Sequence, residues 1–216
     1  MKAIRAKVFT KKLPQKFYEE HAPLILLTIE ESELAHRGQL RWDKSLYILH
    51  SFAVCLILTN EFHFLDIYTF LAGLKHDGPE DKKTQKGEDD EQEKIRQNQG
   101  VEPASIVRAV TKPRNEKERY LWFVRLLLSC DFRAYILKFA DRIHNLRTLA
   151  NLPKAKRRKK LAETKLYFPI LRDALVVLVA EAINKGDLHP SYSGLPTLCF
   201  EILEKEILKL EALKNF

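Results

Sequence analysis

Apolar residues recur every three or four positions along most of the chain, the spacing that places them on one face of an α-helix. The alternation of apolar and polar residues that marks a half-buried strand is hard to find, and only seven glycines interrupt the pattern. The chain is therefore predicted to be nearly all-helical. Apolar positions with this spacing occur at Leu46, Leu49, Ala53 and Ile57, at Ile67, Phe70, Leu71 and Leu74, and within residues 120–128 and 134–149.

A further apolar stripe lies within the helices expected over residues 172–216. Core packing explains such a stripe most simply. A seam between two copies of the chain is the alternative, so an oligomer formed through the C-terminal helix stays open. The stripe consists of Ile202, Leu203, Ile207, Leu210 and Leu213.

Two stretches depart from this pattern through their charge. Between Gly78 and Pro103 the composition shifts to charged residues and Gln, so residues 82–100 are predicted to form a charged, solvated loop with at most one short helix. A basic run at residues 154–160 follows Pro153 and is expected to open a helix. Such a run is usually only the solvated face of a helix.

The length of 216 residues suits one domain over residues 1–216 and excludes two full catalytic domains. A net charge of +8 favours an anionic partner, whether nucleic acid, membrane headgroups or a phosphorylated small molecule. No stretch reaches the ~18 apolar residues of a membrane span, and the basic N-terminus lacks the apolar part of a signal peptide. We therefore expect a cytoplasmic protein with no membrane partner. Cys55, Cys130 and Cys199 lack CxxC spacing and are predicted to be reduced core residues.

Several ways of handling phosphate are excluded by the motifs that are missing. The chain contains no GxxxxGK[ST] loop and no GxGxxG loop, so a glycine-rich backbone does not cradle a nucleotide phosphate. The GxSxG motif of serine hydrolases is also missing. Any phosphate chemistry must therefore depend on side chains or a metal ion.

Two histidines and two carboxylates form the candidate chemical centre. His76 and Asp77 follow an apolar helix and precede Gly78-Pro79, which should end that helix. His50 lies on an apolar helix face, and Asp141 interrupts an otherwise apolar pattern. A buried carboxylate needs a hydrogen bond, an opposite charge or a metal. Two imidazoles with two carboxylates suit a divalent ion such as Mn, Fe, Co or Zn, with positions left for water.

A second polar set follows Asp141 along the same predicted helix. Asn145 and Thr148 lie four and seven residues further on, so all three side chains share one helix face. This face could present a metal ligand and two polar contacts to one substrate, or simply bond to neighbouring segments. His144 and Arg147 are expected to project elsewhere and to be structural.

Four sequence blocks carry a family resemblance: residues 35–58, LKHDGPED at 74–81, VTK at 110–112, and residues 137–171. The order His, His-Asp, Asp is that of the HD-domain metal-dependent phosphohydrolases. HDxxED together with ADRxHNxRT resembles the hydrolase half of the RelA/SpoT-homologue family more specifically. Because 216 residues leave no room for a synthetase domain, the chain looks like a stand-alone small alarmone hydrolase.

This resemblance implies an all-α HD-domain fold with a single metal site that binds one Mn²⁺ per chain. It further implies removal of the 3′-diphosphate of (p)ppGpp as pyrophosphate. Trp42 stands where a basic residue is usual in the family, so (p)ppApp remains an alternative substrate. The chain could instead be an NADPH 2′-phosphatase, or a catalytically silent regulatory module that binds nucleotide.

The resemblance also assigns roles residue by residue. An anionic nucleotide is the expected partner, and the basic run would form a positive rim around it. Nucleic acid is disfavoured, because no aromatic residues are interleaved with the run to stack on bases. The implied metal ligands are His50, His76, Asp77 and Asp141; the catalytic acidic pair is Glu80 and Asp81; Arg41, Asn145 and Thr148 line the nucleotide site, and Arg158 is the predicted phosphate contact of the rim.

Overall fold

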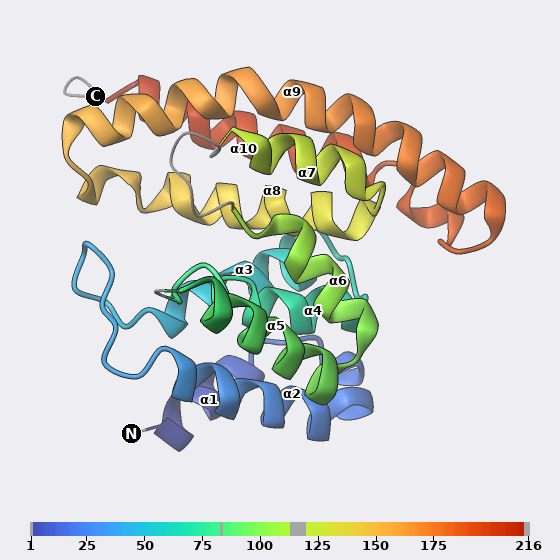
Figure 1. Cartoon of the computed structure of the whole chain (residues 1–216). Helices are drawn as coiled ribbons and strands as arrows, with labels where there is room; N and C mark the ends of the chain where they lie inside the picture. The colour runs from blue at the N-terminus through green and yellow to red at the C-terminus, as the bar shows by residue number, and fades with distance from the viewer. Residues whose placement is uncertain (1, 83, 113–119, 214–216) are drawn as a thin grey trace.

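A computed structural model describes residues 2–82, 84–112 and 120–213. These ranges contain helices and turns but no named β-strand, which confirms the predicted all-α fold. Figure 1 shows the order of the helices along the chain. Those α-helices are α1 (Lys2–Thr10), α2 (Gln15–Ala35), α3 (Ile48–Leu56), α4 (Ile67–Lys75), α5 (Gln85–Gln99), α6 (Val101–Val110), α7 (Leu121–Ser129), α8 (Phe132–Arg147), α9 (Lys154–Lys185) and α10 (Leu195–Glu211).

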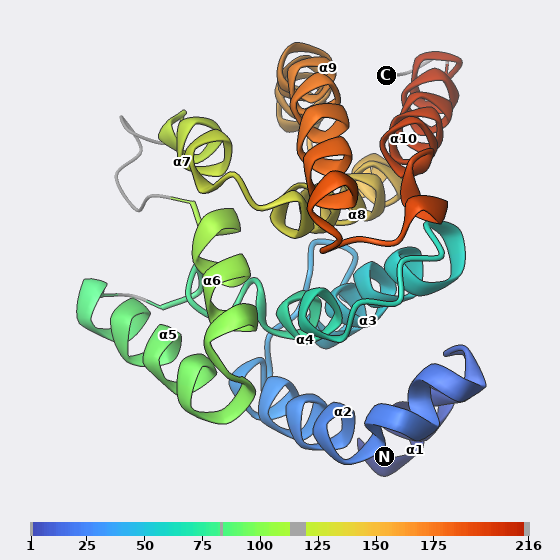
Figure 2. The ribbon, with the colours of Figure 1, turned by 90° about the vertical axis from the view of Figure 1, so that its right-hand side faces the viewer.

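Helix α8 lies at the centre of the fold. It packs against α3, α4 and α6 on one side and against α9 and α10 on the other. Figures 1 and 2 show α8 between these two groups of helices, with α1 and α2 beyond α3 and α4. Nearly all of α8 from Ala134 to Ile143 is buried, so polar groups on this helix face protein rather than water.

Two apolar clusters fill the interior. The larger one gathers around α8 and includes Tyr135, Phe139 and Phe168, whose side chains are almost fully buried. The smaller one joins α1 and α2 to α3 and α4, with Phe9 stacked on Phe52 at a ring distance of 4.2 Å. Helices α3 and α4 are thus held from both sides, which restrains the side chains at their ends.

The prediction of a charged loop over residues 82–100 is wrong. Helix α5 occupies most of this segment, and its first turn is capped by Thr84, whose side chain accepts a hydrogen bond from the Gly87 amide. The helix packs against α6 and carries one buried stripe with four-residue spacing. That stripe consists of Glu91, Ile95 and Gln99. Because only one residue of the stripe is apolar, hydrophobic periodicity gave no sign of this helix.

The predictions for the cysteines and the C-terminal stripe are met in part. Cys55 and Cys199 are free and buried, but Cys130 is exposed at the end of α7, contrary to its predicted core position. Leu203 and Leu210 of α10 are buried, whereas Leu213, which follows the helix, is about half exposed. Core packing therefore accounts for the inner part of the stripe, and a dimer seam stays a prediction. None of the described helices combines the length and apolar character needed to cross a membrane.

Candidate metal centre and active site

Three helices bring the predicted metal ligands together. His50 lies in the first turn of α3, His76 and Asp77 follow directly after α4, and Asp141 lies in α8. Gly73 allows α3 and α4 to approach closely, because a Cβ atom at this position would lie 3.1 Å from Cys55 Sγ. The apolar faces of these helices thus position four polar side chains at one buried point.

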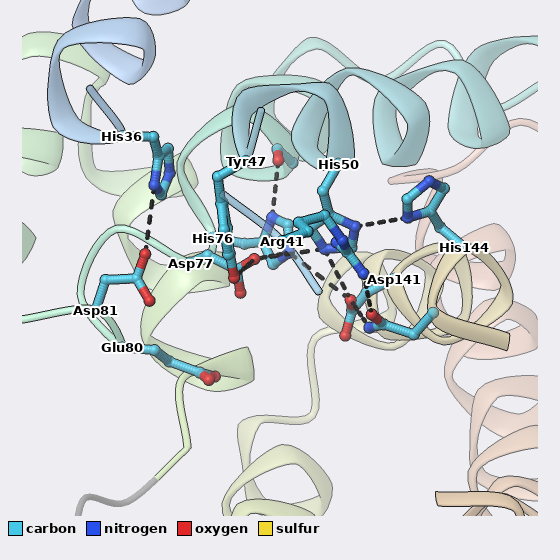
Figure 3. Close-up of polar contacts among 12 residues, drawn as sticks. His36, Arg41, Tyr47, His50, His76, Asp77, Glu80, Asp81, Asp141 and His144 are labelled. Atoms are coloured by element: carbon cyan, nitrogen blue, oxygen red, sulfur yellow. Dashed lines mark hydrogen bonds and ion pairs between the residues drawn. The ribbon is translucent and has the colours of Figure 1, made fainter. Parts of the chain in front are cut away.

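The geometry of the four side chains is compact, as Figure 3 shows. His50 Nε2 lies 3.2 Å from Asp141 Oδ1 and 3.4 Å from Asp77 Oδ2. His76 Nε2 lies 3.3 Å from Asp77 Oδ2 and 3.9 Å from Asp141 Oδ1. One ligand atom from each of His50, His76 and Asp141 lies within 4.8 Å of the others, and all three residues are buried.

The hydrogen bonding of the two His76 ring nitrogens shows that this site fits a divalent cation. His76 Nδ1 donates to the Gly73 carbonyl oxygen at 2.8 Å, because a carbonyl can only accept. In the neutral imidazole Nε2 then carries the lone pair, and this atom is buried without a hydrogen-bond partner. A buried lone pair facing two carboxylates is the arrangement in which a metal ion completes the bonding.

Electrostatics keeps the carboxylates ionised. Burial by itself would raise the pKa of Asp141, but the Lys138 charge and a hydrogen bond from His50 hold that pKa well below its usual range. The pKa of Asp77 is also lowered, since the His76 and His50 interactions outweigh burial. The pKa of His50 is raised against the effect of burial by its hydrogen bonds to Asp141 and Asp77. The site therefore favours positive charge between these groups.

His144 lies in this centre, contrary to the expectation that it projects elsewhere. Its Nδ1 is 2.7 Å from His50 Nδ1. Burial and the nearby His50 charge lower the pKa of His144 to about 3, so His144 is neutral and accepts the proton of His50 Nδ1. This contact leaves His50 Nε2 directed at the carboxylates. Arg147 does have a structural role, since it pairs with Glu61 and Glu206.

The predicted nucleotide contacts form one hydrogen-bonded group. Arg41 Nη2 donates to Asn145 Oδ1 at 3.0 Å and to Thr148 Oγ1 at 3.3 Å. Asn145 Nδ2 in turn donates to Asp141 Oδ1 at 2.5 Å. Arg41 lies in a loop closed by the isolated bridge between Leu40 and Leu46. The structure thus brings these three residues to the edge of the metal centre, while their binding role stays a prediction.

The two acidic residues after the HD pair point in different directions (Figure 3). Glu80 accepts a hydrogen bond from the Lys112 backbone amide at 2.9 Å, and its other oxygen lies 3.7 Å from Lys112 Nζ. Asp81 Oδ2 lies 3.3 Å from His36 Nδ1. Both carboxylates border the turn that carries His76, and their catalytic role stays a prediction.

Four cations surround Asp141, and sequence reasoning had pointed to only one of them, Lys160, as part of the basic run. The charge of each interacts favourably with the Asp141 carboxylate. Lys138 and Arg142 interrupt the apolar pattern of α8 just as Asp141 does, which was the available signal. Burial and neighbouring cations lower the pKa of Lys160 to about 8. We call the set of Lys112, Lys138, Arg142 and Lys160 the cation cluster.

The basic run begins α9 as predicted, with Lys154 as its first helical residue. Lys160 joins the cation cluster from this run, and Lys156 Nζ lies 4.2 Å from the centre of the Trp42 ring. Arg158 is exposed. Its predicted contact with phosphate stays a prediction, and Lys160 of the same run interacts with Asp141.

Comparison with known proteins identifies the class to which this fold and site belong. The family model described as "HD domain" matches residues 29–175, which include every residue of the metal centre. The chain therefore belongs to the HD domain family, as its metal ligand pattern indicates.

The sequence relatives define the branch within that family. A guanosine-3′,5′-bis(diphosphate) 3′-pyrophosphohydrolase of Haemophilus influenzae is 34% identical over 180 residues, covering 79% of this chain and 25% of the relative. A GTP pyrophosphokinase of Streptomyces antibioticus is 35% identical over 146 residues, covering 64% and 16%. The resemblance to RelA/SpoT enzymes is thus confirmed. The chain spans only a sixth to a quarter of the length of these relatives.

A solved structure has the same fold, and it is described with the words "A metazoan ortholog of SpoT hydrolyzes ppGpp and plays a role in starvation responses". The two chains superpose with a TM-score of 0.61 at 22% identity, covering 83% of this chain and 93% of the other. This likeness shows that the two chains share a helical fold over most of their lengths.

Proposed function

We propose that this protein is a metal-dependent pyrophosphohydrolase that removes the 3′-diphosphate of (p)ppGpp or a related alarmone. The observation that carries the proposal is His76 Nε2, a buried lone pair without a hydrogen-bond partner that faces two carboxylates. The names of the relatives supply the substrate class. The reaction would yield GDP or GTP and pyrophosphate.

His50, His76 and Asp141, with Asp77 beside them, would hold the metal ion. We propose Mn²⁺ as the native ion, one per chain, on the family resemblance. A bound divalent ion would lower the pKa of a water molecule and offset negative charge on the scissile phosphate. His144 and the Gly73 carbonyl oxygen fix the two imidazoles so that both Nε2 atoms face the ion.

The cation cluster would receive the diphosphate. A 3′-diphosphate carries several negative charges, and the four cations around Asp141 would neutralise them without the reorganisation that water requires. Lys138 and Arg142 are 2% and 4% exposed, so their charges act in a poorly screened environment. Both cations interact with the Asp141 carboxylate, which would also bind the metal ion.

Hydrolysis requires one proton acceptor and one proton donor. The water oxygen bonds to the phosphorus attached to O3′, the bond between that phosphorus and O3′ breaks, and O3′ takes up a proton. Glu80 and Asp81 are the carboxylates we assign to accept and relay the proton of the water. Lys112 holds Glu80 at the edge of the cation cluster.

The nucleoside end would lie against the group formed by Arg41, Asn145 and Thr148. A guanidinium can stack on a base, and the Asn145 and Thr148 side chains offer hydrogen bonds to sugar or base. Trp42 lies next to Arg41 and stays exposed, with Lys156 over its ring. Guanine is the leading base, and adenine is the alternative that Trp42 keeps open.

One assay tests the proposal and separates its alternatives. Purified protein loaded with Mn²⁺ is incubated with ppGpp, ppApp or NADPH, and the products are resolved by anion-exchange chromatography. We expect pyrophosphate and GDP from ppGpp, and none after chelation of the metal. Release of inorganic phosphate from NADPH alone would instead identify a 2′-phosphatase. Binding of nucleotide without any product would indicate a silent regulatory module.

A further inference from the structure

His36 is a buried histidine that the proposed reaction does not use. It ends α2 as the C-cap residue and is only 5% exposed. Figure 3 shows it above Asp81, with Tyr47 between it and His50 of the metal centre. Burying an imidazole costs free energy unless its ring nitrogens are hydrogen-bonded, so the partners of His36 deserve inspection.

Those contacts fix the direction of its hydrogen bonds. His36 Nδ1 lies 2.7 Å from Gln39 Oε1 and 3.3 Å from Asp81 Oδ2. A carboxylate can only accept, so Nδ1 carries a proton and shares it between Gln39 and Asp81. The Asp81 side chain is 29% exposed and keeps access to solvent and substrate. His36 therefore holds one oxygen of Asp81 in place through this contact.

The ring of Tyr47 supports this arrangement. It stacks on His36 with a centroid distance of 4.8 Å and an angle of 21° between the planes. Its hydroxyl donates to Asp77 Oδ2 at 2.9 Å. The two stacked rings thus each contact one carboxylate: His36 contacts Asp81, and Tyr47 contacts Asp77. The imidazole cannot rotate without losing both the stack and its hydrogen bonds.

We infer that His36 is a positioning residue that aims the Asp81 carboxylate at the water used in hydrolysis. This inference rests on the proposed function. It assigns to Asp81 a fixed orientation that its exposed position at the end of the turn would not provide. The contact spans 45 positions in sequence and joins the end of α2 to the turn after α4, so the orientation depends on how these two helices pack.

A matched pair of substitutions isolates the Nδ1 contact. The amide nitrogen of Asn occupies about the place of Nδ1, whereas that of Gln occupies about the place of Nε2. Both substitutions remove the stack on Tyr47, so any shared loss of stability cancels in their comparison. We therefore compare H36N, H36Q and H36A with wild-type protein, each loaded with Mn²⁺, for metal content, thermal midpoint, kcat and KM on ppGpp.

We expect H36A and H36Q to keep the metal and KM and to lose about 10- to 100-fold in kcat, the usual effect of removing a group that orients an active-site side chain. H36N should regain most of that kcat. Equal kcat for H36N and H36Q, or wild-type kcat for all three, would overturn the inference while leaving the proposed function intact. A wild-type protein that hydrolyses no ppGpp would refute the proposed function, and the positioning role would fall with it.

Discussion

Replacing Lys138 by Met tests whether this buried cation balances the negative charge of Asp141 when no metal ion is bound. The lysine is 2% exposed, and its Nζ lies 3.5 Å from Asp141 Oδ2 and 3.3 Å from the Val110 carbonyl oxygen. Met fills nearly the same volume, so K138M removes the charge while leaving little cavity. Asp141 then loses its strongest favourable charge interaction.

The magnitude follows from the geometry. At 3.5 Å and an effective dielectric constant of about 20, the attraction between the two charges is about 5 kcal/mol. Desolvation of Lys138 offsets part of this attraction, and removing one partner of a buried pair typically costs about 3–5 kcal/mol. For a domain of this size that corresponds to a fall of roughly 10 °C in thermal midpoint. We expect this loss in metal-free protein.

A bound divalent ion should remove most of the loss, because it supplies positive charge to the same carboxylate. By linkage, K138M should then bind Mn²⁺ more tightly than wild-type protein. Thermal unfolding followed by circular dichroism, in EDTA and in excess Mn²⁺, measures the first effect. Calorimetric titration with Mn²⁺ measures the second.

Lys75→Met is the matched control. Lys75 is also buried, at 4% exposed, but it pairs with Glu31 and Glu91 rather than with a metal ligand. K75M should destabilise the protein. Added Mn²⁺ should stabilise K75M by no more than it stabilises wild-type protein. The reasoning is refuted if K138M is equally destabilised with and without the metal, or if Mn²⁺ rescues K75M to the same extent.

Three further predictions concern the site directly. His76→Ala should lose the bound metal in elemental analysis, and wild-type protein that holds no metal after Mn²⁺ loading would refute the metal centre. Glu80→Gln should keep the metal while kcat on ppGpp falls by roughly 10²–10⁴, the scale of lost general acid or base help; near wild-type turnover would exclude Glu80 as that group. Arg158→Ala should raise KM several-fold without changing metal content, and the effect should shrink at 1 M salt, where the screening length is ~3 Å. An unchanged KM would make Arg158 a solvated surface charge.

The amino-acid sequence alone determined the helical class and singled out the residues that we predict to be metal ligands. Helical periodicity is a local property, since residues three and four apart meet on one face whatever the rest of the chain does. The ligands stand out because His50 and Asp141 interrupt apolar faces, where a polar group needs a partner. Helix α5 escaped prediction because its buried stripe contains a single apolar residue, Ile95.

Tertiary structure alone decided which side chains meet in the site. His144 approaches His50 across 94 positions, and Arg41 reaches Asn145 across 104. The physical reason is that packing of α3, α4 and α8 sets the directions in which their buried polar groups point, and no spacing along the chain encodes that direction. The contact of His36 with Asp81 and the convergence of the cation cluster on Asp141 depend on the same packing.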